Sequence, residues 1–194
     1  MKLTIKHQES YSRGELLLRS FFGFFYIALP HGILLWFTAI WASILLFAAW
    51  WVVLFTGRFP QSWFEFIVKF LNWQARVNAS MSNLVDGYPA FFPSGTSDSV
   101  SLEVEYPEEL DRVSVLLRTF FGIFYVMIPH GLCLYIRMIG TMFLMFIAWW
   151  VVLFTGEYPP DWHAFNVGTY RWQFRVNLYM MYMTDEYPPF SGKE

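Results

Sequence analysis

Residues 50–57 read WWVVLFTG, and the same eight residues return at 149–156, which is 99 positions later. The tripeptide PHG at 30–32 returns at 129–131 with the same offset. About half of the positions between 17 and 91 are identical to their counterparts, and the alignment needs no gap. The chain is therefore a tandem duplication, and each unusual polar residue in a repeated segment occurs as a pair.

The composition is that of a membrane protein. Of the 194 residues, 56% are hydrophobic, 22% are aromatic and only 14% are charged, whereas a soluble domain carries roughly 25% charged residues. The abundance of Trp and Tyr is typical of interfacial belts, so membrane lipids are the expected surroundings. The net charge of −2 makes nucleic acid an unsuitable partner. The single cysteine, Cys133, excludes an internal disulfide and a cysteine-based zinc site.

The duplication divides the chain into repeat 1 (residues 1–89), a Ser-, Pro- and Gly-rich linker (90–101) and repeat 2 (102–194). Each repeat begins with alternating apolar residues that predict a short extended stretch. An apolar block follows, and a glycine and a proline end it. A mixed segment closes each repeat. The apolar blocks are 17–56 and 116–155, and the mixed segments are 61–84 and 161–183.

Each apolar block is too long for one perpendicular crossing. A straight helix over 21–55 would be about 50 Å long, against a hydrocarbon core of about 30 Å. If each block folds back as a helical hairpin, twelve of the thirteen Lys and Arg residues lie on one side, and only Arg137 lies near the far turn. The positive-inside rule therefore favours the hairpin over a single crossing of each block.

The mixed segments predict amphipathic helices at the membrane surface. Glu65, Lys69, Asn72 and Arg76 follow one another at spacings of four, three and four, which places them on one helical face. Burying so many polar groups in the bilayer would be costly, so an interfacial position fits better. The predicted fold is an all-α integral membrane protein, a tandem duplication of a helical hairpin plus an interfacial amphipathic helix.

His31 and His130 follow prolines inside the apolar blocks. Two interpretations are open. Facing each other across a pseudo-twofold axis, the two imidazoles would suit haem iron. Otherwise each histidine solvates the backbone that its proline frees. Crowding by Phe and Trp favours the structural role, so no cofactor is expected and haem remains the alternative.

Arg76 and Arg175 recur in the motif Trp-Gln-x-Arg-Val-Asn, after Trp73 and Trp172. Guanidinium groups suit lipid phosphate, which makes these four residues a candidate lipid site. A generic interfacial anchor of Trp beside Arg explains the same pattern. A buried ion pair is the third possibility. The acids available for it are Asp86 and Asp185.

The ordered set Leu-Arg, Pro-His, Trp-x-x-x-Leu-x-Thr-Gly-x-x-Pro, Arg/Asn-Trp-x-x-Arg-Val and Asp-x-Tyr-Pro-Pro-Phe resembles a bacterial membrane domain of unknown function, family 4389 of that series. The first copy departs from the pattern at Asn72 and Ala90. The resemblance covers nearly the whole chain as two tandem copies and implies a bacterial integral membrane protein, without an activity. The second copy matches at Arg118, Pro129, His130, Gly156, Pro159, Arg171, Trp172, Arg175, Asp185, Tyr187, Pro188, Pro189 and Phe190.

The expected function is non-catalytic, because the sequence carries no nucleotide-binding, metalloprotease or serine-hydrolase motif. We expect a structural or accessory subunit that packs against other membrane proteins or forms a homo-oligomer. The alternative is a lipid- or haem-binding protein, and small-solute transport is less favoured because neither apolar block contains an acid. The expected location is the bacterial inner membrane, multi-pass, with the termini and amphipathic helices on the cytoplasmic side.

Overall fold

The computed structural model describes residues 1–193, and most of this length is helical. The two repeats contain the same elements in the same order. Repeat 1 consists of β1 (Lys2–Ile5), α1 (Arg13–Gly23), the π-helix η1 (Phe24–Ala28), α2 (Leu29–Thr56) and α3 (Gln61–Met81). Repeat 2 consists of β2 (Val100–Glu103), α4 (Arg112–Gly122), the π-helix η2 (Ile123–Met127), α5 (Ile128–Thr155) and α6 (Pro160–Met180).

Each apolar block forms one continuous helix, so the predicted hairpins are wrong. The first helix runs from Arg13 to Thr56 over 44 residues, or about 66 Å. Thr38 and Ser43, at the expected turn, instead donate hydrogen bonds of 2.8 Å to backbone carbonyls one helical turn earlier. Such bonds satisfy a hydroxyl within a helix, and no Pro-Gly turn interrupts this region. Arg137 likewise lies inside α5 and not at a turn.

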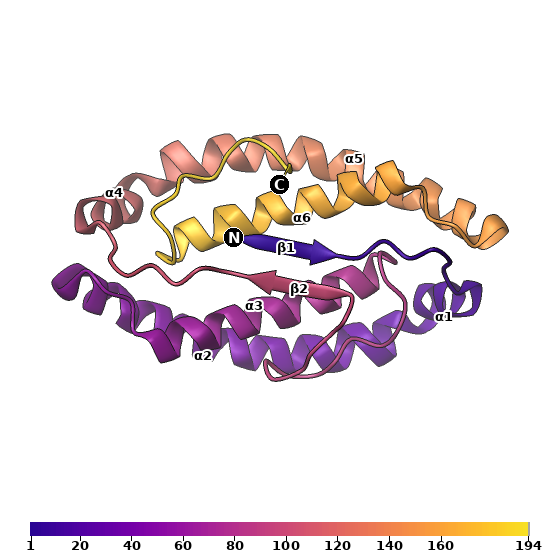
Figure 1. Cartoon of the computed structure of the whole chain (residues 1–194), viewed down its shortest axis with the longest axis horizontal. Coiled ribbons are helices and arrows are strands. Elements are labelled where there is room, and N and C mark those ends of the chain that lie inside the picture. Colours follow the sequence, from indigo (N-terminus) through magenta and orange to yellow (C-terminus); the bar gives the residue numbers. More distant parts are fainter. Residues whose placement is uncertain (194) are drawn as a thin grey trace.

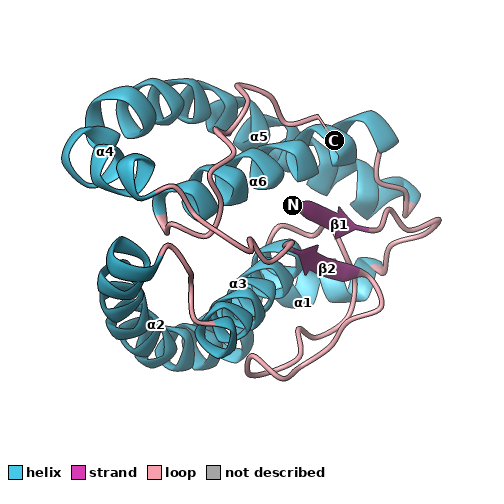
Figure 2. Cartoon of the chain, turned by 60° about the vertical axis from the view of Figure 1, so that its left-hand side comes forward, coloured by secondary structure: helices cyan, strands magenta, loops and turns pink. Residues whose placement is uncertain are grey.

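Both long helices bend, as the curved outlines of α2 and of α4–α5 in Figure 2 show. The π-helix provides a cause. The N–H of Leu29 bonds to the carbonyl of Phe24, five residues earlier, and that of Ile128 bonds to Ile123. A π-helical turn of this kind bends a helix, and so does a proline. Pro30 and Pro129 follow the two π-helices.

The two long helices form the upper and lower borders of the elongated molecule in Figure 1. The first segment of each long helix packs against the other long helix, since α1 contacts α5 and α4 contacts α2. Trp50 donates a 2.8 Å hydrogen bond from its indole to Thr119, and Trp149 donates one of 2.7 Å to Ser20. The repeats are therefore joined at both ends.

The inner helices and the sheet fill the space between these borders (Figure 1). The predicted extended stretches are confirmed, since β1 pairs with β2 antiparallel and Leu3 lies opposite Leu102. Each strand packs on the inner helix of the other repeat. β1 packs on α6 and β2 packs on α3. The guanidinium of Arg171 donates to the carbonyl of Leu3 at 3.2 Å, and the amide of Asn72 donates to that of Leu102 at 2.6 Å.

The mixed segments form the predicted helices, α3 and α6, and both helices pack into the protein interior. About half of the residues in α3 and in α6 are buried within the protein. Asn72 and Arg76, which belong to the predicted polar stripe, donate hydrogen bonds to backbone carbonyls of Leu102 and Phe92. Both partners are distant in the sequence. The pattern of polar residues therefore cannot show whether these side chains bond to protein or to water.

The outward faces of the long helices are apolar and uncovered. Phe21 is 70% exposed and Phe55, near the other end of the same helix, is 71% exposed. Phe120 and Phe154 are 67% and 72% exposed in the second repeat. Both helices are long and apolar enough to cross a membrane, and only 17% of their most apolar windows is buried.

Candidate functional site

Each long helix carries a buried arginine and a buried histidine on its inner face. The segment that follows the inner helix closes over both of them. We call residues 86–91 and 185–190 the closing loops, and they contain the Asp-x-Tyr-Pro motif. The buried side chains are Arg19, His31, Arg118 and His130.

Arg118 fixes one end of the second closing loop. Its side chain is fully buried. One terminal nitrogen donates to the carbonyls of Tyr179 and Thr184 at 2.8 and 2.6 Å, and the other pairs with the carboxylate of Asp185. The guanidinium thus compensates a carboxylate, a carbonyl left at the end of α6 and a carbonyl of the segment that follows it.

Arg19 repeats this arrangement in the first repeat. It donates to the carbonyls of Ser80 and Val85 at 3.0 and 2.5 Å and to Asp86 at 2.8 Å. The other carboxylate oxygen of Asp86 accepts the backbone N–H of Ser12 at 2.6 Å. The two aspartates therefore pair with arginines of the long helices, and the considered ion pairs with Arg76 and Arg175 are not formed.

The histidines lie in separate aromatic boxes within their own repeats. The indole N–H of Trp73 donates to Nδ1 of His31 at 2.9 Å, and the ring of Phe91 stacks on the imidazole with centroids 4.0 Å apart. Because Nδ1 accepts this bond, the neutral ring carries its proton on Nε2. The same arrangement occurs in the second repeat. Its members are His130, Trp172 and Phe190.

This geometry does not suit the haem alternative. The only lone pair of each neutral imidazole accepts the indole proton, and one ring face is covered by a phenylalanine. Each histidine is enclosed by its own repeat, so His31 and His130 do not face one another. Among residues 1–193, no group of three or more His, Cys, Asp or Glu side chains could hold a metal ion.

The tyrosines of the closing loops donate hydrogen bonds to the backbone where the long helices bend. Pro30 has no N–H for the carbonyl of Tyr26, four residues earlier. The hydroxyl of Tyr88 donates to this carbonyl at 2.8 Å. In the second repeat, Tyr187 donates to the carbonyl of Tyr125 at the same distance. Each closing loop therefore satisfies the backbone group that its proline frees.

Removing this hydroxyl should destabilise the fold. We expect Tyr187→Phe to lower the free energy of unfolding by about 1–3 kcal/mol, because the carbonyl of Tyr125 loses its donor. Thermal unfolding in detergent measures the change. Tyr135→Phe is the matched control, since Tyr135 is 68% exposed on α5. Equal effects of the two substitutions would refute this role of the closing loop.

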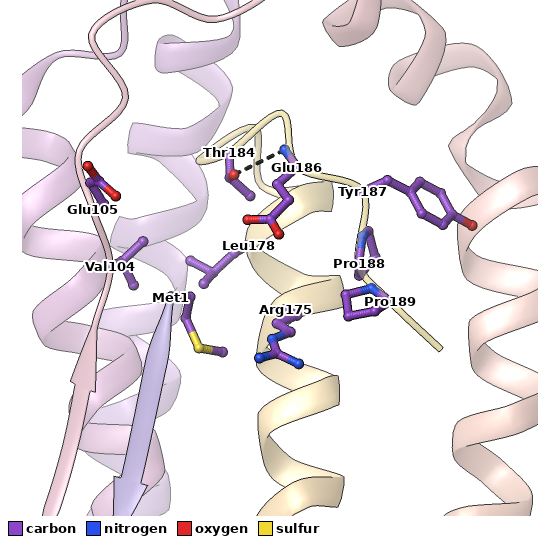
Figure 3. A pocket seen from close by; sticks show the side chains of 10 residues that line it. All are labelled: Met1, Val104, Glu105, Arg175, Leu178, Thr184, Glu186, Tyr187, Pro188 and Pro189. Atoms are coloured by element: carbon purple, nitrogen blue, oxygen red, sulfur yellow. Dashed lines mark hydrogen bonds between the residues drawn. The ribbon is translucent and has the colours of Figure 1, made fainter. Parts of the chain in front are cut away.

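The tryptophans of the proposed lipid site point inward, because Trp73 and Trp172 donate to the histidines. Arg175 donates to the carbonyl of Lys193 at 2.7 Å. It lines a cavity of about 170 Å³ together with Glu105 and Glu186 (Figure 3). Two carboxylates therefore line this cavity and would repel an anion, so the Arg175 site is poorly suited to phosphate. Arg76, in contrast, lies beside the linker without an acidic partner among residues 1–193.

A histidine cluster, His7 and His163, joins the two repeats. Nε2 of His163 donates to the carbonyl of Leu84 at 3.1 Å, and Nε2 of His7 donates to that of Tyr158 at 2.6 Å. The two imidazoles meet edge to face, 5.0 Å apart. Burial lowers the pKa of His163 to about 4. No spacing in the sequence marks this cluster, because its members come from three segments that lie far apart in the chain.

The lowered pKa of His163 predicts that the stability of the fold depends on pH. The unfolded chain takes up a proton near pH 6.5, whereas the folded chain does so near pH 4. Stability is therefore fully present above pH 6.5 and falls as the pH drops towards 4, by on the order of 2–3 kcal/mol. Thermal unfolding between pH 7.5 and 4 tests this prediction. His163→Gln keeps a donor for Leu84 and should flatten the profile, so an unchanged profile would exclude His163 as its source.

Comparison with known proteins agrees with the repeat structure. A family model described as a domain of unknown function (DUF4389) matches residues 16–93 and again residues 112–192. No curated protein and no solved structure gives a significant match. The two matched segments correspond to the two structural repeats, so the predicted tandem copies are confirmed.

Proposed function

We propose that this chain, which belongs to the DUF4389 family through both of its repeats, is a non-catalytic membrane protein that acts as a structural or accessory subunit. Its two long helices lie in lipid, and the sheet and linker form a small polar region at the membrane surface. The observation that carries the proposal is the uncovered aromatic face that follows both helices from end to end.

Such a face is unfavourable in water. Burying one large apolar side chain is worth about 1.5–3 kcal/mol, and soluble monomers rarely expose extended apolar patches. Lipid chains or apolar partners would cover this face at no such cost. The most exposed aromatic residues of the two helices are Phe21, Phe24, Phe25, Trp36, Phe37, Phe47, Phe55, Phe120, Phe124, Tyr135, Phe143, Phe146 and Phe154.

The position of the strands supports a flat orientation in one leaflet. In Figure 1, both strands and both marked termini lie midway along the molecule. A perpendicular orientation would place Lys2, Lys6 and Glu103, which are exposed, near the bilayer centre. Charges and uncovered irregular backbone are expensive there. With the long axis in the membrane plane, the apolar faces enter lipid and the sheet and linker remain in water.

This orientation replaces the multi-pass hairpin topology but keeps the proposed location, the cytoplasmic side of a bacterial inner membrane. In this orientation the positive-inside rule places the exposed Lys and Arg residues towards the cytoplasm. The buried arginines and histidines hold the closing loops, which supports a structural role for them. The exposed aromatic faces would contact other membrane proteins or a second copy of the chain.

Membrane extraction followed by sizing tests the proposal. We expect the protein to stay in the membrane fraction after alkaline carbonate treatment. In mild detergent it should elute as a particle larger than one chain, with copies of itself or defined membrane proteins. Release by carbonate would contradict the membrane placement. A single-chain particle without companions would contradict the role as a subunit.

A further inference from the structure

A groove separates the middle of α3 from the linker that joins the two repeats. Its volume is about 400 Å³. Lys69, Asn72 and Arg76 form the α3 side. The linker side is built mostly from small polar residues, with four hydroxyl groups. These lining residues are Pro93, Ser94, Gly95, Thr96, Ser97, Val100 and Ser101.

Arg76 is an incompletely satisfied cation in this groove. The residue is only 4% exposed. One terminal nitrogen donates to the carbonyl of Phe92 at 2.8 Å, but the buried Nε has no hydrogen-bond partner. Burial lowers the pKa of Arg76, since no carboxylate compensates the lost hydration. Asp86 lines a smaller adjoining cavity, but Arg19 and the N–H of Ser12 occupy its carboxylate.

The remaining lining groups favour an anion. Lys69 lies seven residues before Arg76, on the same face of α3, and is exposed. The Ser97 hydroxyl accepts the N–H groups of Ser99 and Val100, each at 3.2 Å, so its own proton remains for another acceptor. Asp98, the only acid of the linker, is not among the residues that line the groove.

Close packing holds the linker against Arg76. A Cβ atom on Gly95 would lie 2.6 Å from the carbonyl oxygen of Phe91 and 3.1 Å from a terminal nitrogen of Arg76. Any larger residue would therefore push the hydroxyl-bearing loop away from the guanidinium. The second repeat offers no equivalent site, because Arg175 shares its cavity with two glutamates.

We propose that this groove binds a phosphate group, held by Arg76 and Lys69 and by the linker hydroxyls. A guanidinium fork beside an ammonium and hydroxyl donors matches the oxygens of a phosphate. The phosphate comes either from an anionic lipid headgroup or from a soluble phosphate compound. Binding of a soluble phosphate goes beyond the proposed function and does not depend on it. Binding of a headgroup requires the membrane placement proposed above.

Calorimetric titration of the full-length protein in a zwitterionic detergent tests the site. The two probes are inorganic phosphate and a short-chain phosphatidylglycerol. We expect saturable binding of at least one probe, weakened at least tenfold by Arg76→Gln and severalfold by Lys69→Gln. Arg175→Gln is the matched control and should leave the affinity unchanged. Lys69 is exposed, so its substitution tests the site even if Arg76→Gln lowers the thermal stability.

The two probes separate the sources. Binding of phosphatidylglycerol with little response to inorganic phosphate identifies a headgroup, and saturation by inorganic phosphate identifies a soluble ligand. The proposal is overturned if wild-type protein binds neither probe. It is also overturned if Arg175→Gln weakens binding as much as Arg76→Gln, or if Lys69→Gln has no effect. Carbonate extraction is measured separately, so failure of the site and failure of the membrane placement give different results.

Discussion

Replacing Arg118 with methionine is expected to lower the free energy of unfolding by about 3–5 kcal/mol, the range for removing one partner of a buried ion pair. The side chain of Arg118 is fully buried, and that of Asp185 is 33% exposed. Methionine would leave the carboxylate of Asp185 and the carbonyls of Tyr179 and Thr184 without their donor. Thermal or denaturant unfolding in detergent measures the loss.

Two further variants identify the cause of the stability loss in Arg118→Met. Adding Asp185→Asn should restore part of the lost stability, because the uncompensated charge is then removed. Arg58→Met is the matched control. Arg58 pairs with Glu109 at 3.5 Å, but their side chains are 68% and 77% exposed, and exposed pairs contribute at most about 1 kcal/mol. If Arg118→Met is as mild as Arg58→Met, the closing loop does not depend on its arginine.

The second large effect is expected on the aromatic face. Phe47 and Phe146 occupy equivalent positions in α2 and α5 and are 67% and 64% exposed. Changing both to aspartate would place two charges in lipid, where the cost of each is at most about 2.5–3.5 kcal/mol, the value at the bilayer centre. We therefore expect the double variant to be nearly absent from the membrane fraction, while the double leucine variant accumulates normally.

The same double variant distinguishes lipid from water around these helices. If water surrounded the face, two aspartates on exposed positions would leave the fold unchanged and increase solubility. Immunodetection of the membrane and soluble fractions gives the distribution, and unfolding of the purified protein gives its stability. A stable, soluble aspartate variant would contradict the lipid placement.

Much of the fold follows from the sequence because its signals are local. The repeat gives two equal units, and alternating apolar residues give the short strands. Gly57 and Gly156 end the long helices in the left-handed conformation, with φ values of 75° and 79°, as their position before a proline indicates. The hairpins were predicted wrongly because charge counting cannot separate a hairpin from a flat helix. Both arrangements place the same cations on one side.

The interior of the site depends on contacts between distant segments. Arg19 and Asp86 are 67 residues apart, as are Arg118 and Asp185. Their equal separation in both repeats is a signal, although many other residue pairs share it. Pro30 indicates that a carbonyl needs a new donor, but not that Tyr88 supplies it. The asymmetry of the Arg76 groove arises from the linker, which occurs only once between the repeats.

The flat orientation is tested most directly by single-cysteine labelling in sealed inner-membrane vesicles, in a Cys133→Ser background. Glu9 and Arg58 are exposed just outside the two ends of the first long helix. Glu157 and Glu108 hold the equivalent places around the second. We expect cysteines at all four positions to react with an impermeant maleimide from the same, cytoplasmic side. Labelling of positions 9 and 157 from one side and of 58 and 108 from the other would show that the helices cross the membrane, and would contradict the account.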